Sequence, residues 1–91
     1  MFLDVDGELV SLDASSRSCL STKLVDEAID WELTALLAEE TDVTVIPLDE
    51  LGALRSLLGR WHADDGVLRE DLRRLQDALA AALCRRAIVA A

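Results

Sequence analysis

Apolar and polar side chains alternate along two short segments at the start of the chain, residues 2–5 and 8–12. A period of two is typical of a β-strand that is buried on one face. Asp6 and Gly7 lie between the segments and favour a two-residue type I′ turn, because both central residues of that turn need a positive φ. We therefore predict an antiparallel hairpin whose buried face holds Val10 and Leu12. An isolated hairpin is marginal in water, so it must pack on helices or pair with a further strand.

The next segment, residues 13–40, changes to helical spacing. Asp13 is a favourable N-cap for a short helical turn, and the three serines that follow it weaken anything longer. From residue 21 onward, apolar side chains recur at steps of three and four, and Ser21 or Thr22 would cap this second helix. The pattern leaves open whether residues 21–40 form one helix or two helices that are broken near Asp30.

A third extended segment follows at residues 43–46, where every side chain is β-branched. This composition favours a strand, and Pro47 at its end indicates a sheet edge or a strand terminus. The hairpin therefore has a third strand to join.

Two further helices are predicted in the remainder of the chain. The first begins at Asp49, which we expect to be its cap, and Glu50 suits the positive end of the helix dipole. Gly52 and Gly59 each weaken this helix by about 1 kcal/mol relative to alanine. Its apolar face would be formed by Leu51, Leu54, Leu57, Leu58 and Trp61.

The last helix is predicted to begin near Val67 and carries a long apolar stripe. Its members are Leu68, Leu72, Leu75, Leu79, Ala82 and Leu83. The first five are spaced by 4, 3, 4 and 3 residues, a spacing that suits extended contact between helices. Asp71 near its start and Arg85 and Arg86 near its end complement the helix dipole. The stripe either packs into the core of this domain or forms part of a groove for a partner helix, and the pattern alone allows both.

These elements predict an α+β fold in which a small three-stranded sheet packs against helices. The chain of 91 residues is long enough for one domain, 1–91, and its hydrophobic fraction of 52% is ample for a core. The net charge of −9 is uneven, because residues 1–54 hold 13 acidic and 2 basic side chains while residues 55–91 hold 5 and 7. An acidic surface repels phosphate, so we expect no nucleic-acid binding.

Cellular location is constrained by the two cysteines and by the hydropathy of the chain. Cys19 and Cys84 are far apart and form no CxxC pair, so we expect reduced thiols in an intracellular protein. The first residues lack the basic start and apolar run of a secretory signal. No segment reaches the roughly 18 apolar residues that a membrane span needs, so we expect no membrane association.

The chain offers no recognisable catalytic or metal-binding motif. His62 is the only histidine, and with two distant cysteines it gives no metal-ligand spacing. There is no glycine-rich phosphate loop and no nucleophile paired with a base. The carboxylate pairs Glu39–Glu40 and Asp64–Asp65 flank the ends of predicted elements, where we expect them to be solvated. We therefore expect a protein that is not an enzyme and that needs no cofactor or metal.

Three motifs in this order resemble the BTB/POZ fold, and specifically the small adaptors of the Skp and elongin C branch. They are "DVDGELVSLD", "SCLSTKLVDEA" and "VIPLDELGALRSLLGRWHADD", and the resemblance covers about residues 2–65. The chain departs from the family where "AIDWELTALLAEE" continues a helix in place of an acidic loop. After Gly66 it matches only in being helical. Skp-type adaptors grip an F-box protein with additional C-terminal helices, so the resemblance favours an elongin-C-like adaptor or a divergent BTB module.

The resemblance implies a ubiquitin-ligase adaptor that bridges a cullin-like scaffold and a substrate receptor. The scaffold would meet the segment formed by Ile46, Pro47, Leu48, Asp49 and Glu50. A receptor helix would lie in an apolar groove of the last helix, formed by Val67, Leu68, Leu72, Leu75, Leu79 and Leu83. Two alternatives stay open: a structural domain that self-associates, and an acidic inhibitor or immunity protein that blocks a basic surface of its partner.

Overall fold

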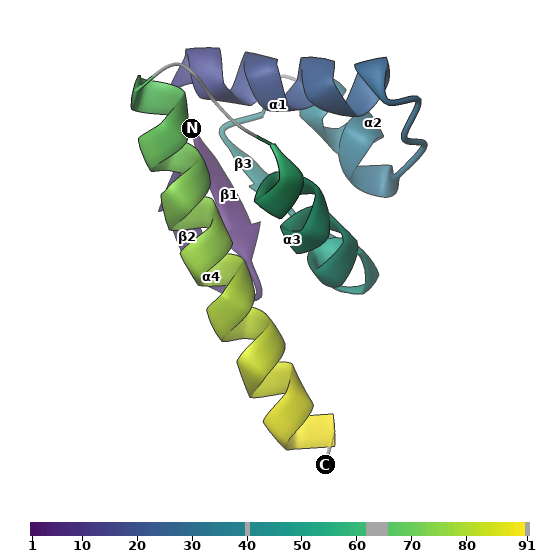
Figure 1. Cartoon of the computed structure of the whole chain (residues 1–91), viewed down its shortest axis with the longest axis vertical. Helices are drawn as coiled ribbons and strands as arrows, with labels where there is room; N and C mark the ends of the chain where they lie inside the picture. Colours follow the sequence, from purple (N-terminus) through teal and green to yellow (C-terminus); the bar gives the residue numbers. More distant parts are fainter. Residues whose placement is uncertain (40, 62–65, 91) are drawn as a thin grey trace.

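The computed structural model describes residues 1–39, 41–61 and 66–90, with the backbone alone for 88–90. It is an α+β structure with three strands and four α-helices in the described part (Figure 1). The elements, in order, are β1 (Phe2–Val5), β2 (Glu8–Ser11), α1 (Ala14–Asp26), α2 (Glu32–Ala38), β3 (Val43–Val45), the 3-10 turn η1 (Leu48–Glu50), α3 (Leu51–Arg60) and α4 (Gly66–Ala90).

The predicted hairpin and the predicted third strand form one sheet with the order β2-β1-β3. β1 pairs with β2 in the antiparallel and with β3 in the parallel direction. Asp6 and Gly7 connect β1 to β2 with φ values of 53° and 94°, the positive values that a type I′ turn requires. β3 lies at an edge of the sheet, as Pro47 at its end indicates. The predicted three-stranded sheet is therefore confirmed.

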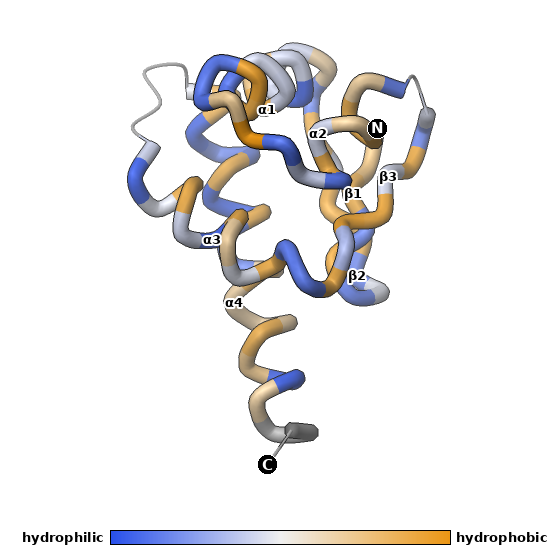
Figure 2. Tube along the Cα trace, turned by 90° about the vertical axis from the view of Figure 1, so that its right-hand side faces the viewer, coloured by the Kyte–Doolittle hydropathy of each residue, from blue (hydrophilic) through white to orange (hydrophobic). Residues whose placement is uncertain are grey.

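The helices cover one face of this sheet and leave the other face open. In Figure 2 the strands run along one side of the molecule, and α3 and α4 lie on the other side. The core between them is built almost entirely from leucine, valine and isoleucine. Its fully buried side chains include Leu3, Val5, Leu20, Leu24, Leu33, Ile46, Leu51, Leu54, Leu57, Leu75 and Leu79.

Helix α1 is longer than its serines suggest. Asp13 caps it as predicted, because the Asp13 Oδ2 accepts hydrogen bonds from the Ser15 N–H at 3.0 Å and from the Ser15 Oγ at 2.6 Å. The helix then continues through Ser21 and Thr22, so the prediction that a second helix is capped there is wrong. The serines are tolerated because the helix gains its stability from buried residues, Leu20 and Leu24, rather than from propensity.

The helical segment that was predicted from residue 21 is broken into α1 and α2 by a left-handed residue. Ala28 has a φ of 54°, its N–H donates to the Val25 carbonyl, and the Ile29 N–H donates to the Leu24 carbonyl. This pair of hydrogen bonds is the Schellman arrangement, which usually places glycine at the position of Ala28. The break therefore lies beside Asp30, the position that the pattern left open.

The start of α3 differs from the prediction. Residues 48–50 form η1, and α3 begins at Leu51 without a side-chain cap, so Asp49 is not its N-cap. The predicted apolar face of α3 is confirmed: its four leucines are buried and Trp61 packs against the core. In both views the C-terminal part of α4 projects beyond the sheet (Figures 1 and 2). None of the helices in the described residues has the length and hydropathy of a membrane span.

Candidate protein-binding surfaces

Most of the leucines predicted to bind a partner along α4 are part of the domain's own core. Leu75 and Leu79 are fully buried, and Leu68 and Leu72 are less than one tenth exposed. Almost none of their surface is accessible to a partner helix, so the predicted groove does not lie along this stripe. The two remaining residues differ: Val67 is exposed, and Leu83 is only partly buried at the rim of the core.

The predicted scaffold face, residues 46–50, is divided between the core and the surface. The Ile46 side chain is fully buried, whereas Leu48 and Asp49 are exposed and Pro47 is partly buried. A partner could therefore touch only the outer part of η1.

Glu50 belongs to the structure of α2 rather than to an exposed face. Its Oε2 accepts the Glu32 N–H at 3.0 Å, and its Oε1 accepts the Leu33 N–H at 3.0 Å. These are free amides of the first turn of α2, a helix whose N-cap residue, Trp31, provides no side-chain hydrogen bond. The carboxylate also suits the positive end of the α2 dipole, so Glu50 caps α2, whereas the sequence predicted only that it would suit the dipole of the helix that follows it.

A cleft of about 500 Å³ lies between α3 and α4. Its lining residues are mostly small or polar: Gly52, Arg55, Ser56 and Gly59 from α3, and Gln76, Asp77, Ala80 and Leu83 from α4. Gly52, Ser56 and Gly59 follow one another at steps of four and three, so they share one face of α3. Leu83, from the predicted groove, is the large apolar side chain of this cleft.

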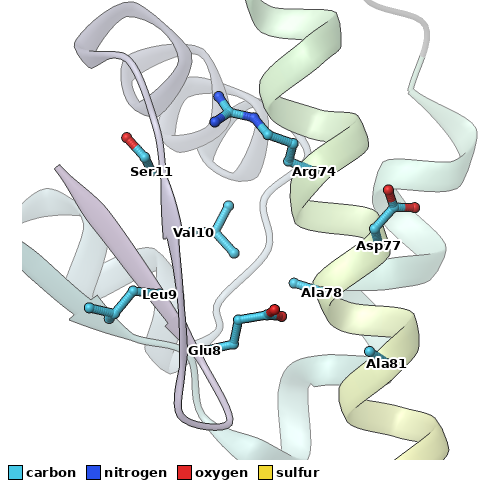
Figure 3. A pocket seen from close by; sticks show the side chains of 8 residues that line it. All are labelled: Glu8, Leu9, Val10, Ser11, Arg74, Asp77, Ala78 and Ala81. Atoms are coloured by element: carbon cyan, nitrogen blue, oxygen red, sulfur yellow. The ribbon is translucent and has the colours of Figure 1, made fainter.

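A second cleft of about 430 Å³ separates β2 from α4 (Figure 3). Val10 points from β2 toward α4, and Ala78 and Ala81 form the opposite wall. Glu8 and Asp77 also line it, so this cleft is more polar in character than the core beneath it.

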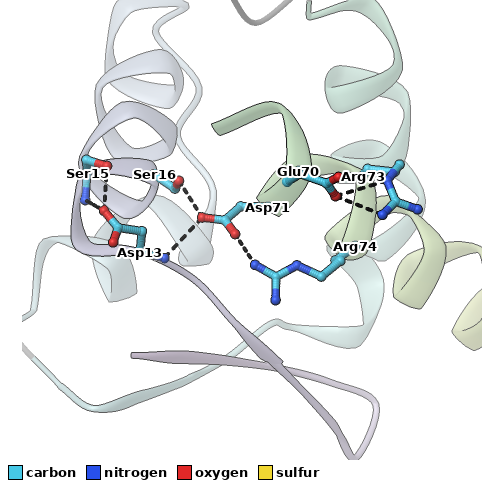
Figure 4. A network of polar contacts seen from close by, with 7 residues as sticks. All are labelled: Asp13, Ser15, Ser16, Glu70, Asp71, Arg73 and Arg74. Atoms are coloured by element: carbon cyan, nitrogen blue, oxygen red, sulfur yellow. Dashed lines mark hydrogen bonds and ion pairs between the residues drawn. The ribbon is translucent and has the colours of Figure 1, made fainter. Parts of the chain in front are cut away.

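A buried carboxylate joins α4 to the start of α1 (Figure 4). Asp71 is 3% exposed, and its Oδ2 accepts the Ser16 Oγ–H at 2.6 Å and the Asp13 N–H at 3.1 Å. Arg74, one turn along α4, donates to the other oxygen. Because all of these groups belong to the chain itself, the network holds two helices together rather than forming an open site.

The environment of these carboxylates shifts their pKa values. Burial alone raises the pKa of Asp71, but the hydrogen bonds from Ser16, Asp13 and Arg74 outweigh it, so the pKa lies below its usual value. The side-chain and backbone hydrogen bonds from Ser15 lower the pKa of Asp13 in the same direction. Both carboxylates are therefore kept in the ionised form, which suits a structural role.

The open face of the sheet, called the outer sheet face below, carries large apolar side chains. They are Phe2, Leu9, Val43 and Val45, which are 39%, 56%, 44% and 58% exposed. The predictions made from the sequence concern only the buried side of the strands, so they do not include this surface. The signal was present, because Val43 and Val45 share one side of β3 while Ile46, directly after it, lies on the other, and because Leu9 and Val10 are adjacent.

The described residues contain no cluster of three or more histidine, cysteine or acidic side chains that is arranged to hold a metal ion. Cys19 and Cys84 are both free and exposed. The predictions for His62, Glu40, Asp64 and Asp65 concern positions outside the described residues. Of the residues that matter for the structure, Ser16 and Asp71 could not be paired from the sequence, because 55 positions separate them.

Comparison of the chain with protein-family models, with curated proteins and with solved structures finds no match. The resemblance to the BTB/POZ fold therefore stays a prediction that rests on the three motifs.

Proposed function

We propose that this chain is a non-enzymatic adaptor of BTB/POZ-like fold that holds a partner helix in the cleft between α3 and α4. The order of elements supports the fold: a hairpin, two helices, a third strand parallel to the first, and two further helices. The proposed binding site for the receptor helix is therefore the α3–α4 cleft and not the buried leucine stripe of α4 that was predicted from the sequence. The role remains the bridging role of the elongin-C-like adaptors.

The observation that carries the proposal is the pair of glycines that faces the cleft. A Cβ at Gly52 would meet nothing within 4 Å, and a Cβ at Gly59 would meet only the Gln76 Nε2 at 3.8 Å. The packing of this domain therefore does not require glycine at either position. Each glycine nevertheless weakens α3 by about 1 kcal/mol relative to alanine. Room for the close approach of another helix gives these glycines a purpose that the fold alone does not.

The rest of the cleft supplies what such a helix needs for anchoring and orientation. Leu83 offers apolar surface, which suits the apolar face of an amphipathic helix. Arg55 on α3 and Asp77 on α4 place charges of opposite sign on the two walls. A partner helix with complementary charges along its sides would therefore bind in one orientation.

The glycines provide a test that separates stability from binding. Gly52→Ala and Gly59→Ala should each raise the free energy of unfolding by about 0.5–1 kcal/mol, which urea denaturation measures. Gly59→Leu should fill the cleft and abolish capture of the partner from cell lysate, with captured proteins identified by mass spectrometry and rebound in purified form. Ala53→Leu, an exposed position of α3 that does not line the cleft, is the matched control.

Two outcomes would change this assignment. If Gly59→Leu and the wild-type chain captured the same proteins, the cleft would not be the binding site. If the isolated chain sedimented as a dimer, the self-associating alternative would be favoured. The acidic-inhibitor alternative is supported by the charge of residues 1–54 and predicts binding that weakens steeply with salt. If a helix inserts into the cleft, its affinity should depend only weakly on salt concentration.

A further inference from the structure

The outer sheet face presents two rows of side chains that the register of the strands defines. The first row places Phe2 between Ser11 and Val43, and the second places Asp4 between Leu9 and Val45. Side chains alternate between the two faces of a strand, so all six belong to the same side. This side is the one that the helices leave open in Figure 2.

The fold itself gives no reason for apolar side chains on this side. The other side of the same strands already supplies the core with Leu3, Val5 and Val10. A sheet with one solvated face usually alternates apolar and polar residues. A contiguous group of exposed large apolar side chains on a small domain marks a contact site for another molecule.

The charge around the outer sheet face defines the chemistry of that molecule. The segments 1–16 and 41–54, which contain all three strands, include no lysine or arginine. Asp4 lies at the centre of the face, where its Oδ1 accepts the Gly7 N–H at 2.7 Å, and it forms no ion pair with any described residue. Asp42 adjoins the end of the first row, since its carbonyl accepts the Phe2 N–H. A second copy of this chain would oppose like charges, whereas a basic partner would neutralise them.

The dimensions of the outer sheet face match one short helix. The two outer strands are about 10 Å apart, which is close to the diameter of an α-helix with its side chains. Four residues of extended chain span roughly 13 Å, the length of about nine helical residues. A helix of two to three turns would therefore cover both rows.

From these observations we propose that the outer sheet face docks a short amphipathic helix that carries lysine or arginine beside its apolar stripe. The apolar stripe would cover Phe2, Leu9, Val43 and Val45, and a basic side chain would pair with Asp4. This site is separate from the cleft between α3 and α4, and it gives the domain a second binding surface on the opposite side of the molecule.

The test uses the full chain and three synthetic helical peptides of about 14 residues. The first has leucines at helical spacing flanked by lysine and arginine, the second has the same leucines flanked by glutamate, and the third is a scrambled form of the first. Fluorescence anisotropy should give at least tenfold tighter binding for the first peptide than for either of the others. Amide chemical-shift changes should map to β1, β2 and β3.

Variants that preserve the strands distinguish the outer sheet face from other surfaces. The double variant Val43→Thr/Val45→Thr keeps β-branched side chains, so it should fold and yet bind the basic peptide at least fivefold more weakly. Asp4→Asn should weaken binding severalfold and reduce its dependence on salt. Val25→Asp, an exposed position on α1, is the control and should bind like the wild-type chain.

The proposal is overturned if the acidic or scrambled peptide binds as well as the basic one, or if none binds. It is also overturned if the shifts map to the α3–α4 cleft, or if the threonine variant shows undiminished affinity. If sedimentation instead detects a dimer that the threonine variant does not form, the occupant of the outer sheet face would be a second copy of this chain and not a basic helix. Each of these outcomes is independent of Gly59→Leu, so the cleft proposal stands or falls separately.

Discussion

The two faces of the sheet carry similar side chains in opposite environments. Leu3 on the inner face is fully buried, whereas Leu9, on the strand that pairs with it, is 56% exposed on the outer face. The inner side chains meet leucines from the helices, whereas the outer apolar side chains stay 39–58% exposed. Hydrophobicity of a strand residue therefore predicts burial only when the layer that covers each face is known.

This contrast separates the residues that hold the fold together from those that are free to bind. Inner residues are exchangeable only at a large cost, because each is surrounded by packed neighbours. Outer residues contribute little to folding, so their apolar character needs another explanation, and binding provides one.

The largest expected effect is the difference between the same substitution on the two faces. Leu3→Ala should lower the free energy of unfolding by about 2–5 kcal/mol, because it leaves a cavity among packed side chains. Leu9→Ala should lower it by less than about 1 kcal/mol, as is usual at an exposed position. Urea denaturation of the two variants measures both values. Equal losses would show that the outer sheet face is covered in solution.

Removal of the buried charge of Asp71, which joins α4 to the start of α1, should have the next largest effect on stability. Asp71→Asn should cost about 1–3 kcal/mol, because Ser16, the Asp13 N–H and Arg74 lose an ionised acceptor. Glu70→Gln, on the exposed side of the same turn, is the control and should cost less than about 0.5 kcal/mol.

The stability difference between Asp71→Asn and the wild-type chain should depend on pH. In the folded chain the pKa of Asp71 lies below its ordinary value of 3.8. The ionised carboxylate therefore stabilises the fold fully at any pH above the pKa that Asp71 has in the unfolded chain. That contribution is lost as the pH falls through the folded pKa. The difference in stability between Asp71→Asn and the wild-type chain should therefore be constant near neutral pH and shrink below about pH 4. A difference that persisted at lower pH would show that the side chain acts through its shape alone.

The smallest effect is expected for a charge at the exposed turn of the hairpin. The Asp6 Oδ2 lies 3.7 Å from the Arg85 Nη2, and the Asp6 Oδ1 lies 3.9 Å from the Arg86 Nη1. Exposed ion pairs of this kind contribute about 0–1 kcal/mol to the free energy of unfolding. Asp6→Asn removes the charge and keeps a residue that tolerates positive φ, so the change in stability should be under about 1 kcal/mol and should vanish at high salt. Thermal melts at two salt concentrations measure it. A larger loss would mean that the end of α4 is essential to the hairpin.

Local signals explain the parts of the fold that the sequence predicted. The period of two and the Asp6-Gly7 pair located β1 and β2, the β-branched run located β3, and the leucine spacing located the buried sides of α3 and α4. In each case the information lies within a few residues of the element that it defines.

Most of the failures come from interactions between distant positions. Whether the helix breaks near Asp30 was left open for a local reason, because Ala28 stands where glycine would have signalled the left-handed turn. Glu50 was assigned to the helix that follows it, although it caps a helix 18 residues earlier. The leucines of α4 were proposed as a partner groove although the pattern also allowed a place in the core, because a stripe of 3.5-residue spacing does not say which surface it meets. Here it meets the domain's own sheet and helices.

The contact of Glu50 with α2 makes a short helix depend on a distant turn of the chain. A helix of seven residues is too short to persist alone in water, and its own sequence leaves its first amides without a side-chain acceptor. The acceptor comes from a turn that is synthesised later and that lies beyond an entire strand. The first turn of α2 is therefore fully hydrogen-bonded only when η1 lies beside it, so the capping of this short helix depends on the tertiary placement of β3 and η1.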